Sequence, residues 1–144
     1  SQNYGACKFD RIKTGIKYGI MIEWIWSTAA VIVVYLLSDK LPLLIVSGEN
    51  SFITGTVAEY LRINVPFYYA LAVLLSLRCS LQGLGNSVFP IVASIIEMLW
   101  KIITVVFIIP SYGYFGVCIS EPIIWVTSGI LVTIITIKML KKVC

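Results

Sequence analysis

The stretch VFPIVASIIEMLWKIITVVFII, residues 88–109, is predominantly apolar and carries only two charged side chains, Glu97 and Lys101. A helix rises about 1.5 Å per residue, so this stretch is long enough to cross a hydrocarbon core of about 30 Å. Strands of a membrane barrel alternate apolar and polar residues, whereas this run is continuous. The stretch therefore predicts a membrane-spanning helix.

Three other stretches have the same character, namely residues 16–37, 63–81 and 114–140. Of the 144 residues, 59% are hydrophobic and 12% are charged, and the mean hydropathy is +0.95. A soluble domain of this size cannot hide so much apolar surface, and a disordered chain would not contain it. The sequence predicts an all-α membrane protein with four antiparallel transmembrane helices in a single partial domain.

The connections between these stretches differ in length. Residues 82–87 and 110–113 are short and contain glycine, which favours tight turns between antiparallel neighbours. The connection 38–62 is longer, and its second half mixes polar and apolar residues. We expect that half to be an amphipathic lead-in at the membrane surface that runs directly into the span at 63–81.

Basic side chains are divided unevenly between the two sides that this topology defines. Because basic residues collect on the cytoplasmic side, we expect residues 1–15 to be a cytoplasmic loop, 38–62 an external connection and 141–144 a cytoplasmic tail, in the plasma (inner) membrane. Lys101 falls inside a span and is not counted. Eight basic residues lie on the side of the two ends, and they are Lys8, Arg11, Lys13, Lys17, Arg78, Lys138, Lys141 and Lys142; the other side has Lys40 and Arg62.

The sequence lacks the residues on which most enzymes and metal sites depend. It has no His, and its four cysteines are too far apart for a zinc or redox motif. Its basic residues flank apolar runs and form no stripe with aromatic residues, which argues against a nucleic-acid-binding surface. We expect no catalytic residue, no metal site, no cofactor and no nucleic-acid partner.

Glu97 and Lys101 lie near the middle of their predicted span, where a charge costs about 2.5–3.5 kcal/mol on insertion scales. They are four residues apart with the acid first, so they share one helix face in the favourable order. Either they line a water-filled cavity and contact an ion or a substrate, or they neutralise each other and lock helices together. In both cases their face should point away from lipid.

Glu121 lies seven residues after the start of the last predicted span, and Pro122 follows it. One interpretation is a buried carboxylate beside a proline kink that binds a cation or carries a proton. The alternative is that the helix begins here, with Ser120 as its N-cap and Pro122 in its first turn. We keep Glu97, Lys101 and Glu121 as candidates for a substrate or ion pathway.

Two more charged residues lie nearer the predicted membrane surfaces. Glu23 is expected to be an interfacial acid near the cytoplasmic side, and Arg78 is expected to extend to the surface or to contact phosphate. Gly83 and Gly85 lack the spacing of a nucleotide-binding loop, so we assign them to a tight turn. The predicted cytoplasmic-edge turn comprises Arg78, Gln82, Gly83 and Gly85.

The order of short motifs along the chain resembles the multidrug and toxic compound extrusion (MATE) transporters. The motifs occur in the family's order along essentially the whole chain. They are SQNYGACK at 1–8, YLRI at 60–63 with PFY at 66–68, Arg78 with LQGLGN at 81–86, SIIE at 94–97 with Lys101, and GYFG at 113–116 with PIIW at 122–125. Two positions depart from the family pattern. Ser1 stands where Gly is usual, and Lys101 stands where the family usually has Arg, whose forked contact Lys cannot make.

The resemblance implies twelve spans in two six-helix lobes, of which this chain would supply spans nine to twelve in the C-terminal lobe. It also implies partners, namely the lipid bilayer, the remaining eight spans and a small lipophilic or cationic substrate. Some members bind the coupling cation through acids on the seventh and tenth spans. The seventh span is outside this chain and the stretch 63–81 has no acid, so no residue here inherits that site.

The expected function is therefore cation-coupled antiport, in which Na⁺ or H⁺ moves inward while a lipophilic, often cationic drug or toxin is exported by alternating access. One alternative is a lipid-linked oligosaccharide flippase of the same superfamily, for which Arg78 and Lys101 are the basic candidates. Another is a non-transporting membrane assembly module, although charges such as Glu97 are costly in a mere scaffold.

Overall fold

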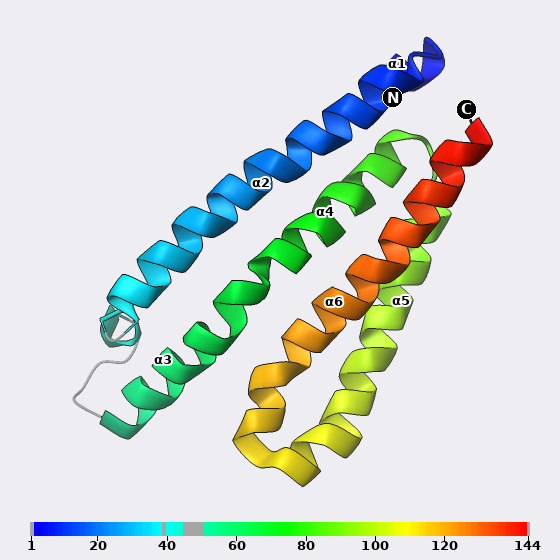
Figure 1. Cartoon of the computed structure of the whole chain (residues 1–144). Helices are drawn as coiled ribbons and strands as arrows, with labels where there is room; N and C mark the ends of the chain where they lie inside the picture. The colour runs from blue at the N-terminus through cyan, green and yellow to red at the C-terminus, as the bar shows by residue number, and fades with distance from the viewer. Residues whose placement is uncertain (1, 39, 45–50, 144) are drawn as a thin grey trace.

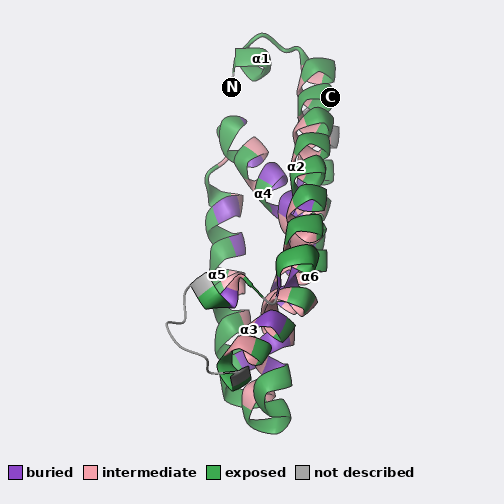
Figure 2. Ribbon diagram, turned by 90° about the vertical axis from the view of Figure 1, so that its left-hand side faces the viewer, coloured by how far each residue is buried: buried purple, intermediate pink, exposed green. Residues whose placement is uncertain are grey.

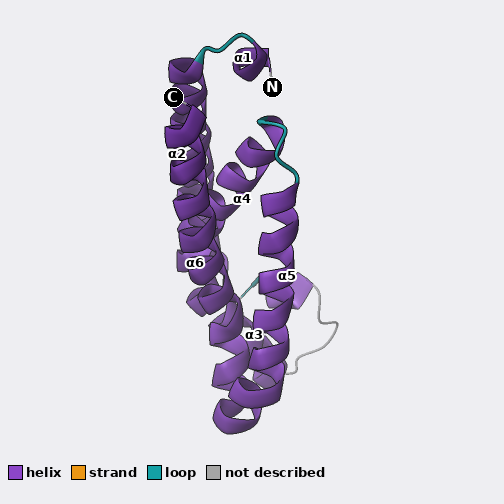
Figure 3. Cartoon of the chain, turned by 90° about the vertical axis from the view of Figure 1, so that its right-hand side faces the viewer, coloured by secondary structure: helices purple, strands orange, loops and turns teal. Residues whose placement is uncertain are grey.

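The computed structural model describes residues 2–38, 40–44 and 51–143. Almost all of these residues are helical and none is in a strand, which confirms the predicted all-α class (Figure 3). In chain order the elements are α1 (Gln2–Gly5), α2 (Phe9–Leu37), η1 (Pro42–Leu44), α3 (Ser51–Asn64), η2 (Val65–Phe67), α4 (Tyr68–Gly83), α5 (Val88–Ile103), η3 (Thr104–Ile108) and α6 (Ile109–Val143).

The long helices run alternately in opposite directions. In Figure 1, α2 leads away from the end of the molecule that holds α1, α3 and α4 return, α5 leads away again, and α6 returns beside it. The start of α2 and the end of α6 therefore lie at the same end of the molecule. Successive long helices are therefore antiparallel, as the short turns predict.

Three helical stretches are long and apolar enough to cross a membrane, namely Phe9–Leu37, Phe52–Gly83 and Val88–Leu140. The last one is 53 residues long and includes the reversal between α5 and α6. The chain is thus a multi-pass membrane protein, while the count of four spans stays a prediction. The span boundaries drawn from the sequence also stay predictions, because helix ends alone do not place a bilayer.

Helix α2 begins at Phe9, within the segment that the sequence assigned to a loop. The loop that does occur is shorter, and it contains Cys7 at a φ of +54°. Asp10 in the first turn favours a helix start, because its charge interacts well with the positive end of the helix dipole. As a consequence Glu23 lies at the middle of the helix and not near its beginning.

The connection after residue 50 is also helical. Helix α3 continues through the short 3₁₀ turn Val65–Phe67 into α4, as expected for a lead-in that runs directly into a span. Pro66 in that turn has no N–H, so the carbonyl of Arg62 loses its helix partner. The hydroxyl of Tyr35 on α2 donates to that carbonyl at 3.1 Å, which keeps it satisfied.

The turn between α4 and α5 follows from Gly85. Its φ of +80° is in the left-handed region, which residues with a side chain adopt at a cost. The amide of Asn86 donates to the carbonyl of Leu81 at 3.1 Å, and the amide of Gly85 donates to that of Gln82 at 3.0 Å. These two bonds form a Schellman motif, which ends α4 and sets the direction of α5.

The reversal between α5 and α6 depends on two other glycines. Gly113 has a φ of +56° and a ψ of −135°, a conformation that only glycine adopts readily. A Cβ on Gly116 would lie 3.0 Å from the carbonyl oxygen of Ile108 and 3.2 Å from the Cα of Ile109. The backbone segments on the two sides of the reversal are therefore in close contact, and a side chain at Gly116 would not fit between them unless the backbone shifted. The π-helical turn Thr104–Ile108 leads into it, with Pro110 just beyond.

The packed centre lies among α4, α5 and α6. It consists of Leu74, Leu77 and Leu81 from α4, Ala93 from α5 and Val132 from α6. Outside it, exposed apolar side chains dominate, and Figure 2 shows buried residues as a minority on each helix. In the most apolar window of α2 only 6% of the residues are buried. Such a surface is suited to lipid or to neighbouring helices.

Candidate functional site

Glu97 forms an ion pair with Arg78, which lies on a different helix. The Arg78 guanidinium donates from Nη2 to Oε1 of Glu97 and so joins α4 to α5. The two side chains are 19% and 20% exposed, so both are largely withdrawn from the surface of the chain. The prediction that Arg78 extends to the membrane surface is therefore wrong, because a carboxylate on the neighbouring helix takes up its charge.

Lys101 forms an ion pair with Glu121, which joins α5 to α6. Its Nζ lies 3.2 Å from Oε1 of Glu121, and the two side chains are 57% and 29% exposed. The sequence suggested that Lys101 could neutralise Glu97 on the same helix. The structure gives each of these two residues a partner on another helix. The prediction that such charges lock helices together is kept, but with different pairs.

These four residues alternate in charge, and we refer to Arg78, Glu97, Lys101 and Glu121 as the charge ladder. The i to i+4 spacing of Glu97 and Lys101 puts the two ion pairs one helical turn apart on α5. Two positive and two negative groups sum to zero, which reduces the cost of holding them among apolar helices. The ladder thus connects three helices with opposite charges and no net charge.

Glu121 lies inside α6 and not at the start of a helix. The helix runs from Ile109 through Pro122 to Val143, and the hydroxyl of Ser120 donates to the carbonyl of Val117 at 2.7 Å. The alternative in which Ser120 caps a new helix is therefore wrong. Pro122 lacks an N–H, which leaves the carbonyl of Cys118 without its usual donor in the helix.

Asn64 supplies the missing donor. Its Nδ2 donates to the carbonyl of Cys118 at 3.1 Å and to that of Tyr60 at 3.0 Å, and the residue is only 3% exposed. Its Oδ1 is buried and has no hydrogen-bond partner among the described residues. Sequence reasoning missed Asn64. A polar amide at the start of a predicted apolar span, with a proline on another span, was the available signal.

Of the four residues assigned to the predicted cytoplasmic-edge turn, only three lie together in a turn. Gln82, Gly83 and Gly85 lie at the end of α4 and in the Schellman turn, where the backbone of Gln82 and Gly85 makes the hydrogen bonds. Arg78 belongs instead to the charge ladder, one turn and more before the end of α4. The glycines act here through backbone conformation, and their turn contains no charged side chain.

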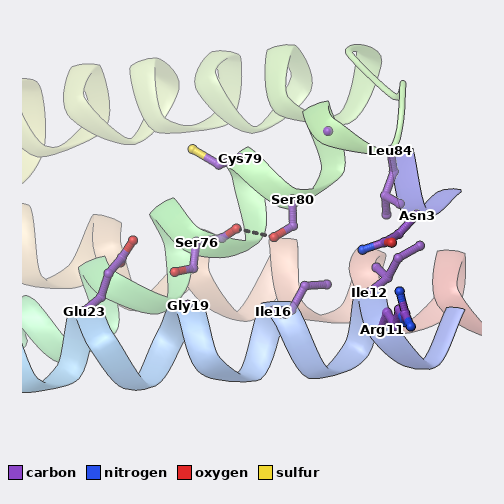
Figure 4. Close-up of a pocket in the computed structure, with 12 residues that line it drawn as sticks. Asn3, Arg11, Ile12, Ile16, Gly19, Glu23, Ser76, Cys79, Ser80 and Leu84 are labelled. Atoms are coloured by element: carbon purple, nitrogen blue, oxygen red, sulfur yellow. Dashed lines mark hydrogen bonds between the residues drawn. The ribbon is translucent and has the colours of Figure 1, made fainter. Parts of the chain in front are cut away.

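A pocket of about 350 Å³ lies between α2 and α4, and we call it the α2–α4 pocket (Figure 4). Glu23 lies at one end of it and Arg11 at the other, with Ser76 and Ser80 on the facing helix. Small residues keep the two helices from filling this space. The remaining lining residues are Asn3, Ile12, Gly15, Ile16, Gly19, Cys79, Gly83 and Leu84.

In the part of the chain that the structure describes, no three His, Cys, Asp or Glu side chains come together. Glu97 and Glu121 are occupied by basic partners, as shown above. Within the same described residues, Glu23 has no basic partner at salt-bridge distance.

The comparison with protein families agrees with the order of motifs and the apolar helices. The MatE family model matches residues 1–107, which include α1 to α5 and most of the π-helical turn. No curated protein matches the chain, and no solved structure does. Since the matched segment covers most of the 144 residues, the chain belongs to the MatE family of membrane transporters.

Proposed function

We propose that this chain is part of a cation-coupled antiporter that exports lipophilic, often cationic compounds in exchange for Na⁺ or H⁺. Membership of the MatE family and the apolar helices support transport across a membrane. The observation that carries the mechanistic part is the charge ladder, whose two cross-helix pairs connect α4, α5 and α6. Alternating access requires a lobe that moves as one body.

The charge ladder is suited to holding such a lobe rigid. Each charge placed in an apolar span costs about 2.5–3.5 kcal/mol, so a motion that separated the pairs would be strongly unfavourable. Glu97 and Arg78 are largely buried and act as a fixed contact inside the lobe. Lys101 is more exposed than its partner Glu121, which supports assigning this end of the ladder to the pathway.

The proposed setting follows the family resemblance. The chain would supply spans nine to twelve, and the other eight spans of the transporter, the bilayer and a small substrate would be its partners. The first and last long helices share one end of the molecule, which supports placing that end in the cytoplasm together with the basic residues (Figure 1). We place the transporter in the plasma (inner) membrane.

The ladder also bears on the flippase alternative. A flippase for a lipid-linked sugar would need basic side chains free to contact a pyrophosphate. Arg78 and Lys101 were the candidates, and each is paired with a carboxylate. These contacts favour export of uncharged or cationic lipophilic compounds over transport of an anionic headgroup.

Reconstitution of the full-length transporter into proteoliposomes tests the proposal. An inward gradient of Na⁺ or of protons should drive ethidium against its concentration gradient, and an ionophore that collapses the gradient should stop it. Vesicles that hold the same transporter but have equal ion concentrations on both sides are the control. Absence of exchange under both gradients would contradict the antiport mechanism, and movement of a labelled polyprenyl-linked sugar instead would support the flippase.

A further inference from the structure

The α2–α4 pocket follows from the packing of two antiparallel helices. On α2 the lining residues recur about every four positions, from Arg11 through Gly15 and Gly19 to Glu23, so they form one stripe. On α4 the stripe runs from Ser76 through Ser80 to Leu84. Because the helices are antiparallel, Ser76 is level with Gly19, one helical turn from Glu23, while Arg11 is level with the end of α4 (Figure 4).

Beyond Glu23, hydrogen bonds join α2 to α4, and in the other direction the pocket extends toward the start of α2. One residue further on, the indole of Trp24 donates to the carbonyl of Tyr69 at 3.3 Å, and the hydroxyl of Thr28 bonds that of Tyr69 at 2.9 Å. These bonds hold α2 against the start of α4. At the other end the lining residues are Asn3 and Arg11, which belong to the polar beginning of the chain. Water can therefore approach Glu23 along the pocket.

Glu23 differs from Glu97 and Glu121 in having no basic partner among the described residues. Glu97 pairs with Arg78, and Glu121 pairs with Lys101. Among the described residues, no basic group lies within salt-bridge distance of Glu23. Arg11 lines the same pocket, but twelve residues along one helix correspond to about 18 Å. An acid at the middle of an apolar helix without a counter-charge is costly and calls for a functional explanation.

A second polar group, Ser76, lies about one helical turn along the same pocket. Ser76 is only 9% exposed and lines the same pocket. In Figure 4 its side chain extends from α4 toward Gly19 on α2. The hydroxyl of Ser76 and the carboxylate of Glu23 therefore line one pocket and offer oxygen ligands, the type that hard cations prefer.

We propose that Glu23, with Ser76 in the same pocket, takes up the coupling cation in this part of the transporter. This inference rests on the proposed function, because a coupling cation exists only in an antiporter. Cation binding neutralises a carboxylate that has no other partner, and this lowers the cost of the loaded pocket closing between apolar helices. The ligand chemistry is a small monovalent cation, either a proton or Na⁺.

Among the described residues, the groups around Glu23 do not compete with it for the cation. On the facing helix α4 the lining residues nearest to it are Ser76 and Ser80, while Asn3 of α1 lies at the far end of the pocket beside Arg11 (Figure 4). The one basic residue of α4, Arg78, is engaged by Glu97. The nearest acid on α3, Glu59, is exposed and does not line the pocket. No competing carboxylate therefore lines the α2–α4 pocket within the described residues.

The test is transport by Glu23→Gln in the full-length transporter, reconstituted in proteoliposomes and driven by a Na⁺ or proton gradient. Glutamine keeps the size of the side chain and removes its charge. We expect gradient-driven ethidium exchange to fall about tenfold or more, while ethidium binding in detergent changes little. Glu59→Gln, the same chemical change on exposed α3, should transport as well as wild type. Wild-type exchange in Glu23→Gln would overturn the inference.

Glu23→Asp and Ser76→Ala cover the case in which Glu23→Gln fails to insert. Both should shift the cation concentration that gives half-maximal exchange, and unchanged half-saturation in both would overturn the inference. A shift in the Na⁺ dependence at constant pH identifies Na⁺, and a shift only in the pH dependence identifies the proton. If the wild type itself shows no exchange, the antiport function fails. If the wild type exchanges and the variants match it, only the role of Glu23 fails.

Discussion

The charge of Glu97 could be neutralised by a partner on its own helix or by a partner on another helix. In the structure the partner is on another helix. An i to i+4 pair on an exposed helix face stabilises by only about 0.2–0.5 kcal/mol. A pair between helices in surroundings of low polarity is stronger, and it also holds the helices together. Arg78 supplies a guanidinium for that pair, and Lys101 is left to reach Glu121 on α6.

Substitution Glu97→Gln should therefore destabilise the protein. It leaves the Arg78 guanidinium without its carboxylate in a largely buried position, at a cost of about 1–3 kcal/mol. Replacing both residues, as in Arg78→Met with Glu97→Met, removes the unpaired charge and should recover most of that loss. Unfolding by SDS, followed by circular dichroism, measures both. If the single and double variants lose the same stability, the pair contributes nothing specific.

A second prediction concerns the carbonyl of Cys118. Asn64→Leu removes its donor and should cost about 1–3 kcal/mol, because a buried carbonyl is left unsatisfied. Pro122→Ala returns an N–H to the helix, so the same Asn64→Leu change should cost about 1 kcal/mol less in that background. The two variants and their combination form a double-mutant cycle. Strictly additive losses would show that Asn64 does not serve the proline.

At the scale of elements, the sequence was informative where one local property decides the outcome. Continuous apolar runs indicated the long helices, and Gly85 indicated the turn after α4. It was uninformative where partners are distant in sequence. Asn64 and Cys118 are 54 residues apart, and a polar amide on one predicted span with a proline on another does not specify which carbonyl the amide contacts. The early start of α2 was missed because polar residues extend the helix beyond its apolar part.

The two reversals should respond to glycine substitution according to backbone conformation. Gly113→Ala should cost about 1–3 kcal/mol, because its φ and ψ are strained for any residue with a Cβ. Gly85→Ala should cost about 1–2 kcal/mol for its left-handed φ. Gly55→Ala on α3 is the matched control, since its Cβ would meet nothing within 4 Å. That control should be neutral or stabilising by up to about 1 kcal/mol.

The same SDS unfolding assay ranks these variants. A loss for Gly55→Ala as large as that for Gly113→Ala would mean that added bulk, and not backbone strain, sets the effect. An unchanged Gly113→Ala would mean that the reversal between α5 and α6 has another conformation available.

For the whole molecule, the distribution of buried residues separates two regions with different roles. Helices α4, α5 and α6 share the packed centre and the charge ladder, so they form the more rigid part. Helix α2 contributes little to that centre and borders the α2–α4 pocket. A site that must open and close is better placed at the loosely packed side, where a small displacement breaks few contacts.

The topology of the whole molecule gives the last prediction. If α5 and α6 cross the bilayer in opposite directions, Cys7 and the reversal near Ser111 lie on opposite sides of the membrane. In a variant whose only thiol is Cys7, which is exposed, a membrane-impermeant maleimide should react from the cytoplasmic side. A variant whose only thiol comes from Ser111→Cys should react from the outside. Ser111 is also exposed, so access to reagent is matched within the chain. Reaction of both thiols from one side would mean that the reversal between α5 and α6 does not reach the outside, and the predicted four spans would then be wrong.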